Sequence, residues 1–427
     1  MQSTSNGPVI LFLQGPASPL WWELANACER RGARIVRVDF GLGDRAYWRR
    51  PGGISYGGRF EDWGDFLKAL IRRKGVTDIL YYGDRQVYHV VAARVAARFG
   101  VKCHAVENGY LRPDWLTLER DGMGAFSHFP NDPEVIRAIA AKLPPPDLAV
   151  RYRHGFADLA FHEVMLALLN FFGAPLRRFR YRSSTYYNPL HEYLAWLPRL
   201  LHIRPLRRRA EAFLRDEITA PYWLLAMQLQ SDHQIRSNSH YGHLSEMLDE
   251  VFTSFAQHAP QGDRLVIKLH PHDNGIERWD RVCAQLAELH GLVGRIKVID
   301  GGDLSILLTR GRGVVLVNST VGLHSLRASK PTLVLGAAVY DMAGLTHQGG
   351  MDTFWTAPEP VDDELMAAFV IALAGTIQIK GDFYDPAGRR AACEEIAARV
   401  IEGRVNEPGA FVDPPPRISG AAASALG

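Results

Sequence analysis

The sequence has 427 residues, 47% of them hydrophobic and 22% charged, and its formal net charge is +3 at pH 7. Such a chain is long enough for two folded domains, and its net charge is too small to indicate a nucleic-acid partner. Its four isolated cysteines form no CxxC pair, which argues against a zinc site and against a secreted disulfide framework. No uncharged apolar run reaches about 18 residues, and the N-terminus lacks the pattern of a signal peptide. We therefore expect a cytoplasmic protein.

The start of the chain has the order of elements that opens a Rossmann-like domain. An apolar strand over residues 9–13 leads into a glycine loop, a helix over 21–31 and a second strand over 34–39. The loop lacks GxGxxG, so a dinucleotide is not indicated. Residues 41–60 are rich in glycine and aromatic residues and are predicted to form a long, functional loop.

Charged side chains follow two further predicted strands, residues 78–82 and 102–106. Asp84 comes after the first strand, and Glu107 and Arg112 come after the second. Parallel strands deliver such residues to one edge of a sheet. Carboxylates beside guanidinium groups suit the binding of a charged substrate and acid–base catalysis. The alternative is a purely structural cluster of ion pairs.

Residues 151–215 break the α/β rhythm. An apolar helix is predicted over 159–172, and arginines interleaved with tyrosines follow it. Because basic and aromatic residues lie next to an apolar helix, we favour contact with an anionic membrane surface. A polyanion or a merely solvated basic helix would fit the same composition. The residues expected to contact the acceptor or the membrane are Arg177, Arg178, Arg180, Arg207 and Arg208.

A second α/β unit begins near residue 221, and three of its predicted strands end in polar residues. The valine-rich strand before residue 318 reads as buried on both faces, and the turn after it precedes a helix. Small polar residues there can cap the helix while leaving N–H groups open to an anion. A histidine fixed by a proline at a strand end can also donate to a phosphate oxygen. We expect a phosphate-bearing ligand to be bound by Gln230 and Asp232, by Lys268, His270 and Pro271, and by Asn318, Ser319 and Thr320.

These elements predict an α/β protein with two Rossmann-like domains facing a cleft, as in GT-B glycosyltransferases, and with a helical basic insertion. The predicted boundaries are 1–150 for the first domain, 151–215 for the insertion and 216–405 for the donor-nucleotide domain. Residues 406–427, rich in Pro, Gly and Ala, are predicted to be disordered.

Several motifs in this order resemble the bacterial capsule polysaccharide biosynthesis and export family. The match spans roughly residues 80–330 and is more specific than any single motif. The motifs are Gly83-Asp84-Arg85-x-x-x-His89, Glu107-Asn108-Gly109-Tyr110-Leu111-Arg112-Pro113-Asp114, Leu229-Gln230-x-Asp232-x-Gln234, Lys268-x-His270-Pro271 and Asn318-Ser319-Thr320-Val321-Gly322.

The resemblance implies a retaining β-Kdo transferase that uses CMP-Kdo to start a linker on a phosphatidylglycerol lipid. It assigns His270, Pro271, Ser319 and Thr320 to the CMP moiety and the motif from Glu107 to the reaction centre. No cofactor or metal is expected beyond the donor. The implied location is the cytoplasmic face of the inner membrane, with a capsule assembly or export complex as a further partner. The alternatives are a non-catalytic export component and a transferase for CMP-sialate or another nucleotide sugar.

One position departs from the family pattern. Relatives often carry two acids before the glycine, whereas this chain has Glu107 followed by Asn108. If the family's nucleophilic carboxylate occupies the second position, another acid must replace it here. Glu107 is the expected nucleophile, Asp84 is the second acid–base candidate, and Asp232 is the remaining alternative. Arg112 is expected to pair with the donor's carboxylate or with the lipid phosphate.

Overall fold

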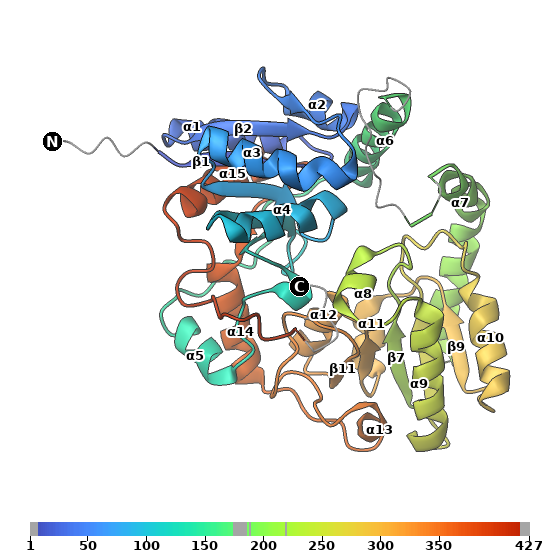
Figure 1. Ribbon diagram of the computed structural model, residues 1–427. Coiled ribbons are helices and arrows are strands. Elements are labelled where there is room, and N and C mark those ends of the chain that lie inside the picture. Colours follow the sequence, from blue (N-terminus) through green and yellow to red (C-terminus); the bar gives the residue numbers. More distant parts are fainter. Residues whose placement is uncertain (1–6, 174–185, 188, 218–219, 419–427) are drawn as a thin grey trace.

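The computed structural model describes residues 7–173, 186–187, 189–217 and 220–418. Two sheets build two halves of the molecule (Figure 1). The first sheet has the strand order β12-β6-β5-β4-β1-β2-β3 and is parallel except that β6 runs antiparallel to β5 and to β12. Its strands are β1 (Val9–Phe12), β2 (Arg34–Asp39), β3 (Ile54–Ser55), β4 (Asp78–Tyr82), β5 (Lys102–Asn108), β6 (Trp115–Arg120) and β12 (Gln378–Lys380).

The second sheet is parallel throughout, with the order β11-β10-β7-β8-β9. Its central strands are buried along their length, as expected for a parallel sheet covered by helices on both faces. This pair of Rossmann-like halves is the GT-B-like architecture, so the predicted fold class is confirmed. The strands are β7 (Tyr222–Ala226), β8 (Arg264–Lys268), β9 (Ile296–Ile299), β10 (Val314–Leu316) and β11 (Thr332–Val334).

Helices cover both sheets, and two longer helices form the insertion between the halves. The helices of the first half are α1 (Leu20–Arg30), α2 (Leu42–Trp48), α3 (Trp63–Lys74), α4 (Val87–Arg98) and α5 (Pro133–Ala140). The insertion contains α6 (Phe156–Gly173) and α7 (Pro189–Ala212). The remaining helices are α8 (His233–Asn238), α9 (Leu244–His258), α10 (Trp279–Leu289), α11 (Leu304–Arg310), α12 (Val321–Arg327), α13 (Met351–Phe354), α14 (Asp363–Thr376) and α15 (Pro386–Ile401).

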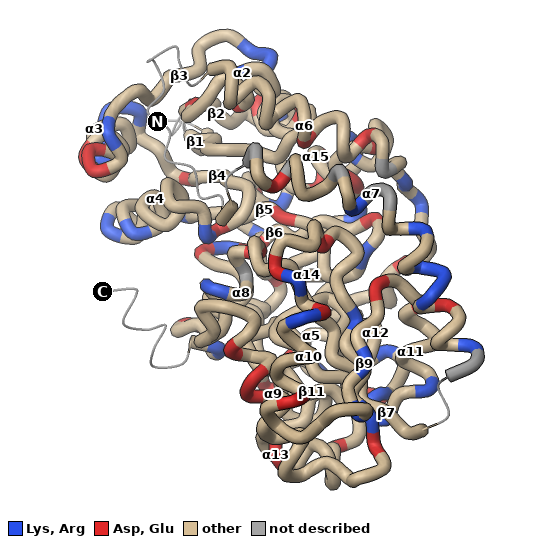
Figure 2. The backbone as a smooth tube through the Cα atoms, turned by 90° about the vertical axis from the view of Figure 1, so that its right-hand side faces the viewer, with Lys and Arg blue, Asp and Glu red and all other residues tan. Residues whose placement is uncertain are grey.

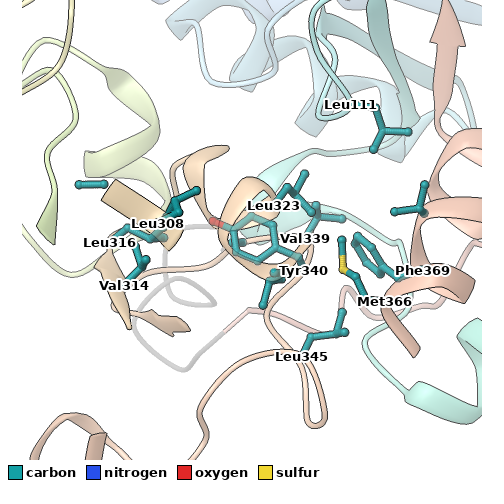
Figure 3. Close-up of a cluster of buried hydrophobic side chains, with 14 of the residues drawn as sticks. Leu111, Leu308, Val314, Leu316, Leu323, Val339, Tyr340, Leu345, Met366 and Phe369 are labelled. Carbon is teal, nitrogen blue, oxygen red and sulfur yellow. The ribbon is translucent and has the colours of Figure 1, made fainter. Parts of the chain in front are cut away.

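One apolar core runs through both halves. Leu111 from the first half lies in the same buried cluster as Leu323, Val339 and Phe369 (Figure 3). Phe369 on α14 is fully buried and meets the ring of Phe129 edge-on, with centroids 5.8 Å apart. The facing surfaces of the halves are therefore joined by buried side chains on one side of the cleft.

The C-terminal boundary of the second domain is wrong in the sequence prediction. After α13 the chain returns to the first half, where β12 pairs with β6 and α15 packs against α1 (Figure 1). The residues from α14 to α15 therefore do not belong to a second domain ending at 405. The return strand has only three residues, too few to show a periodic pattern.

The prediction of a disordered tail is also wrong for residues 406–418. Asn406 is fully buried, and its side-chain oxygen accepts a hydrogen bond from the backbone N–H of Arg120. Arg417 donates to the carbonyl oxygens of Phe129 and Pro130 in the first half and of Val339 in the second. These contacts form only in the folded chain, so tail composition did not reveal them. Residues 419–427 lie outside the described part.

The segment 41–60 and the insertion differ in how well they were predicted. Residues 41–60 are not one long loop, because they contain α2 and β3 and bury Trp48 and Tyr56 in the core.

The insertion is helical, as expected, although Arg177, Arg178 and Arg180 lie outside the described residues. None of the helices in the described ranges is long and apolar enough to cross a membrane.

Replacing Arg417 with alanine should lower the free energy of unfolding by about 2 kcal/mol, because three carbonyl groups lose a charged donor. Urea denaturation measures this change. The matched control is Arg404→Ala, which removes only an exposed pair with Glu402 and should cost less than about 0.5 kcal/mol. Equal stability of the two variants would contradict a structural role for the tail.

Candidate functional site

Glu107 lies near the carboxyl end of β5, in a hairpin held from both sides. Its backbone pairs with Thr117 of β6. The chain reverses at Gly109, whose N–H bonds to the carbonyl of Trp115 at 2.8 Å, and a Cβ there would meet that oxygen at 2.3 Å. The side chain of Gln378 on β12 accepts from the N–H of Tyr110 at 2.8 Å. The returning C-terminal segment thus fixes the turn that follows Glu107 and carries Arg112.

The protonation of Glu107 depends on both halves of the molecule. Burial, helped by the negative charges of Asp84 and Asp232, raises the pKa of Glu107 to about 8. The Arg112 guanidinium acts in the opposite direction. Asp84 belongs to the first half and Asp232 to the second, so the cleft places carboxylates of both halves within electrostatic range of Glu107. A carboxyl group with a raised pKa in a cleft is a candidate for proton transfer.

The other two members of this acidic group differ in accessibility. Asp84 is 1% exposed, accepts from the N–H of Met123 at 3.0 Å and pairs with Arg85 at 3.0 Å. The side chain of Asp232 is 33% exposed. Asn108 is exposed, and its amide donates to the hydroxyl of Tyr82 at 3.2 Å. Asp84 therefore acts on Glu107 through its charge, while Asp232 is open to a ligand.

His270 lies just beyond β8 with its tautomer defined. Its Nδ1 accepts from the N–H of His272 at 3.1 Å, so Nε2 carries the proton of the neutral ring. Burial, together with His272, Lys268 and Arg112, lowers the pKa of His270 to about 4. Pro271, the next residue, is exposed. At neutral pH His270 thus offers an uncharged N–H donor near the basic side chains of Lys268 and Arg112.

The turn after β10 is held by residues that the motif does not contain. The side chain of Gln228 both donates to Asn318 Oδ1 at 2.8 Å and accepts from the Asn318 N–H at 3.0 Å. Tyr340 donates its hydroxyl proton to the carbonyl of Ser319. A Cβ at Gly322 would lie 2.4 Å from that hydroxyl, so only glycine permits this close packing.

The predicted helix cap at this turn is confirmed in part. Ser319 Oγ accepts from the N–H of Val321 at 3.2 Å. Thr320 occupies the N-cap position of α12 but makes no side-chain cap bond there. The hydroxyl of Thr320 is therefore not used in capping.

Gln230 has a structural position. It is 2% exposed, accepts from the N–H of Leu244 at 2.8 Å and donates to the carbonyl of Gly242 at 3.4 Å. It fixes the start of α9 beside the cleft. Lys268, at the end of β8, is half-buried, and burial lowers its pKa while Asp300 acts in the opposite direction.

Arg112 is the charged group that the two halves share. It is exposed and donates from Nε to the carbonyl of Gly109 at 3.2 Å. Its charge affects the pKa values of Glu107 in the first half and of His270 and His324 in the second. The structure therefore brings Arg112 within electrostatic range of both Glu107 in the first half and His270 in the second.

Sequence reasoning missed several residues of this site. Gln228 directly precedes the motif that begins at Leu229, and its i, i+2 spacing from Gln230 after a predicted strand is a signal that was available. His324 lies on α12, two residues after the motif that ends at Gly322. Tyr340 and Gln378 come from distant segments and carry no local pattern.

The predicted acceptor residues Arg207 and Arg208 lie on α7 and are exposed. They belong to the C-terminal part of that helix, together with exposed Arg204 and Arg209. The chain packs here against the end of β9, because a Cβ at Gly301 would lie 3.2 Å from the Cα of Arg207. These arginines are therefore part of the flank of the second half.

Comparisons with known proteins place these residues in a family context. The family profile described as "Capsule polysaccharide biosynthesis protein" matches residues 77–384. The chain is 31% identical to the capsule polysaccharide export protein KpsS of Escherichia coli, with 89% of this chain and 97% of that protein covered. It is 28% identical to the capsule polysaccharide modification protein LipB of Neisseria meningitidis serogroup B, with coverages of 88% and 91%. The solved structure of Thermosulfurimonas dismutans KpsC, a beta Kdo 2,7 transferase, matches with 14% identity, a TM-score of 0.45 and coverages of 92% and 98%.

Replacing Glu107 with glutamine should make stability less dependent on pH. Between its usual pKa of 4.5 and the raised value of about 8, Glu107 keeps its proton in the folded state and loses it in the unfolded state. The wild type should therefore lose stability relative to Glu107→Gln as pH rises through this window, by at most about 1.4 kcal/mol per pH unit. Urea midpoints at pH 5, 6, 7 and 8 measure the difference.

The matched control is Glu288→Gln, which removes the same charge from an exposed position on α10. It should leave the pH profile of stability unchanged. Parallel profiles for wild type and Glu107→Gln would show that the folded chain does not raise the pKa of Glu107.

Proposed function

Since the chain belongs to the capsule polysaccharide biosynthesis family, we propose that it is a glycosyltransferase that moves Kdo from CMP-Kdo to a phosphatidylglycerol-type lipid. The product would start the linker of a capsule polysaccharide. The family establishes the pathway, and the donor, the acceptor and the retaining stereochemistry are parts of the proposal. The observation that carries it is the meeting of Glu107, Arg112 and His270 between the two halves.

The second half offers the groups that a CMP phosphate needs. His270 presents Nε2–H after β8, and the hydroxyls of Ser319 and Thr320 follow β10, which is separated from β8 by β7 in the same parallel sheet. In sheets of this kind ligands bind outside the carboxyl ends of the strands. Lys268 adds positive charge near His270. Asn318, held by Gln228, keeps the turn in place rather than contacting the ligand through its side-chain oxygen.

Arg112 suits the carboxylate of the donor sugar. An exposed guanidinium can form two parallel hydrogen bonds with a carboxylate, and Kdo carries one. The charge of Arg112 affects the pKa of both Glu107 and His270. A donor whose sugar carboxylate is bound by Arg112 could therefore have its phosphate at His270 and its anomeric carbon at Glu107. A neutral sugar would leave this cation unpaired.

Glu107 supplies the carboxylate for a two-step transfer with retention. An ionised Glu107 oxygen attacks the anomeric carbon, and the bond from that carbon to the phosphate oxygen breaks, so CMP leaves with the electron pair. The lipid hydroxyl then attacks the same carbon and displaces Glu107, while its proton passes to Asp232, the accessible carboxylate of the second half. Asp84 is buried behind Glu107 and positions it through charge.

The proposal places the protein on the cytoplasmic face of the inner membrane, where a lipid acceptor and a nucleotide donor are both accessible. A capsule assembly or export complex would receive the product. The names of the relatives include export and modification proteins, so a non-catalytic role in binding finished glycolipid is the competing function. That role requires no CMP site.

The decisive test is transfer by the purified chain. CMP-Kdo generated in place and a short-chain phosphatidylglycerol should give a product heavier by one Kdo residue in mass spectrometry. His270→Ala should reduce transfer by about 100-fold or more because the phosphate loses a positioned donor. The matched control His258→Ala changes an exposed histidine at the end of α9, away from the carboxyl ends of the strands, and should transfer as wild type does.

The outcomes separate the candidate functions. Product from wild type but not from His270→Ala supports the proposal. CMP binding without product points to another CMP sugar, such as sialate, or to another acceptor. If folded protein gives neither product nor CMP binding, the non-catalytic function is correct and the transferase proposal fails.

The affinity for CMP should depend on pH through His270. Its pKa is about 4 in the free protein, and a bound phosphate should raise it, so binding takes up a proton as the solution becomes acidic. Between pH 7 and pH 5 the affinity ratio of wild type to His270→Asn should rise by up to about tenfold. Taking the ratio cancels the protonation of CMP itself, whose phosphate titrates near pH 6. Titration calorimetry gives the affinities, and a ratio that does not change with pH would show that the bound phosphate does not raise the pKa of His270.

A further inference from the structure

The outer face of α6 carries five large apolar side chains exposed to solvent. Phe161 is 60% exposed, Val164 46%, Leu168 44%, Phe171 71% and Phe172 68%. At 100° per residue they fall within one arc of the helix. Single exposed apolar residues are normal on a protein surface, but a continuous stripe with three phenylalanines indicates an interaction surface. We call these five residues the α6 stripe.

The opposite face of α6 is anchored to the first half. His162 Nδ1 lies 2.8 Å from the hydroxyl of Tyr47, and Asn170 accepts from the N–H of Gly43 at 2.9 Å. The ring of His162 also stacks on Tyr384, with centroids 5.7 Å apart. Because these contacts fix the rotation of the helix, the α6 stripe must point away from the molecule.

The anchored face of α6 is connected to the reaction centre. Glu163 is hydrogen-bonded to Tyr384. Glu107, Tyr384 and Glu163 all affect the pKa of Tyr82, which burial raises well above its usual value. Tyr82 in turn accepts a hydrogen bond from Asn108, the neighbour of Glu107. The anchored face of α6 is therefore linked through Tyr384 and Tyr82 to the end of β5, where Glu107 lies.

The helix that follows adds positive charge on the same flank of the molecule. Both α6 and α7 lie on the right-hand side of Figure 1, α6 beside the first half and α7 beside the second, and Figure 2 shows the cations along α7. Arg204, Arg207, Arg208 and Arg209 are exposed there. Arg199, by contrast, is paired with Asp300 and serves the fold.

We propose that the α6 stripe inserts into the surface of an anionic lipid bilayer, with the arginines of α7 contacting the headgroups. Exposed phenylalanines on a helix next to a cluster of cations are the combination that binds such an interface. The inference rests on the proposed function, because it names the surface from which a lipid acceptor would reach Glu107.

The test is co-sedimentation of the full chain with vesicles of phosphatidylglycerol and phosphatidylethanolamine. The triple variant Phe161→Ser, Phe171→Ser, Phe172→Ser should bind at least about tenfold more weakly than wild type. The matched control is Leu289→Ser, Val293→Ser, which removes two side chains that are each 72% exposed. Leu289 is the last residue of α10 and Val293 lies between α10 and β9, far from α6 in Figure 1, so the control should bind as wild type does.

The charge contribution is tested separately. Arg204→Gln, Arg207→Gln, Arg208→Gln should weaken binding to these vesicles by roughly fivefold for each arginine that contacts the surface. The same variant and wild type should bind phosphatidylcholine vesicles equally. Added salt should weaken binding by the wild type more than by this variant.

A labelled variant keeps the proposal testable if the triple variant does not fold. All four native cysteines are buried, so Phe171→Cys can carry an environment-sensitive dye. Anionic vesicles should shift its emission to shorter wavelength and leave labelled Leu289→Cys unchanged. Wild-type protein that does not sediment, stripe variants that bind as wild type, or a dye that does not respond would each overturn the proposal.

The two proposals can fail independently. If only the bilayer proposal is correct, the wild type binds vesicles but gives no product. If only the transferase proposal is correct, the stripe variants and the wild type transfer Kdo equally well to both short-chain soluble lipid and lipid in vesicles. If both are correct, the stripe variants lose transfer only to lipid in vesicles.

Discussion

The position of the site depends on the apolar core that runs through both halves. Leu111 immediately precedes Arg112, and Leu323 immediately precedes His324, and both leucines are buried in this one core. Each fully buried leucine stabilises the packed arrangement by about 1.5–3 kcal/mol. A motion that separated the halves at this point would expose these side chains to water. Burial therefore fixes the charged residues relative to each other, although none of them lies in the core itself.

The environment of the site favours the uncharged forms of one group in each half, Glu107 in the first and His270 in the second. Burial favours the uncharged form of each group, so it raises the pKa of Glu107 and lowers the pKa of His270. The Arg112 guanidinium lies within electrostatic range of both groups. An anionic ligand would favour protonation of His270, whereas Arg112 supports ionisation of Glu107. The cleft therefore contains two groups whose protonation can respond when a phosphate arrives.

The sequence predicted the parts of the fold and site that depend on local pattern. Buried strands and the polar turns after them are recognisable because side-chain periodicity and turn chemistry act over a few residues, which is why Glu107, His270 and Ser319 could be named in advance. The return of β12 could not be predicted, since three residues carry no periodicity. The supports of the loops are also non-local: Gln378 contacts Tyr110 across 268 positions. The tail shows the limit of composition, because Arg417 finds its carbonyl partners only after both halves have folded.

The asparagine at position 108 can be understood from the same electrostatics. A second carboxylate there would add negative charge next to Glu107, which already faces Asp84 and Asp232, and would raise the pKa of Glu107 further. The neutral amide instead donates to Tyr82, whose ring lies on the side of the cleft toward α6. Asn108 thus keeps the charge of the loop low and connects it to the helix that carries the α6 stripe. With asparagine at position 108, the pKa of Glu107 stays at about 8, so a fraction of this carboxyl group is ionised near neutral pH.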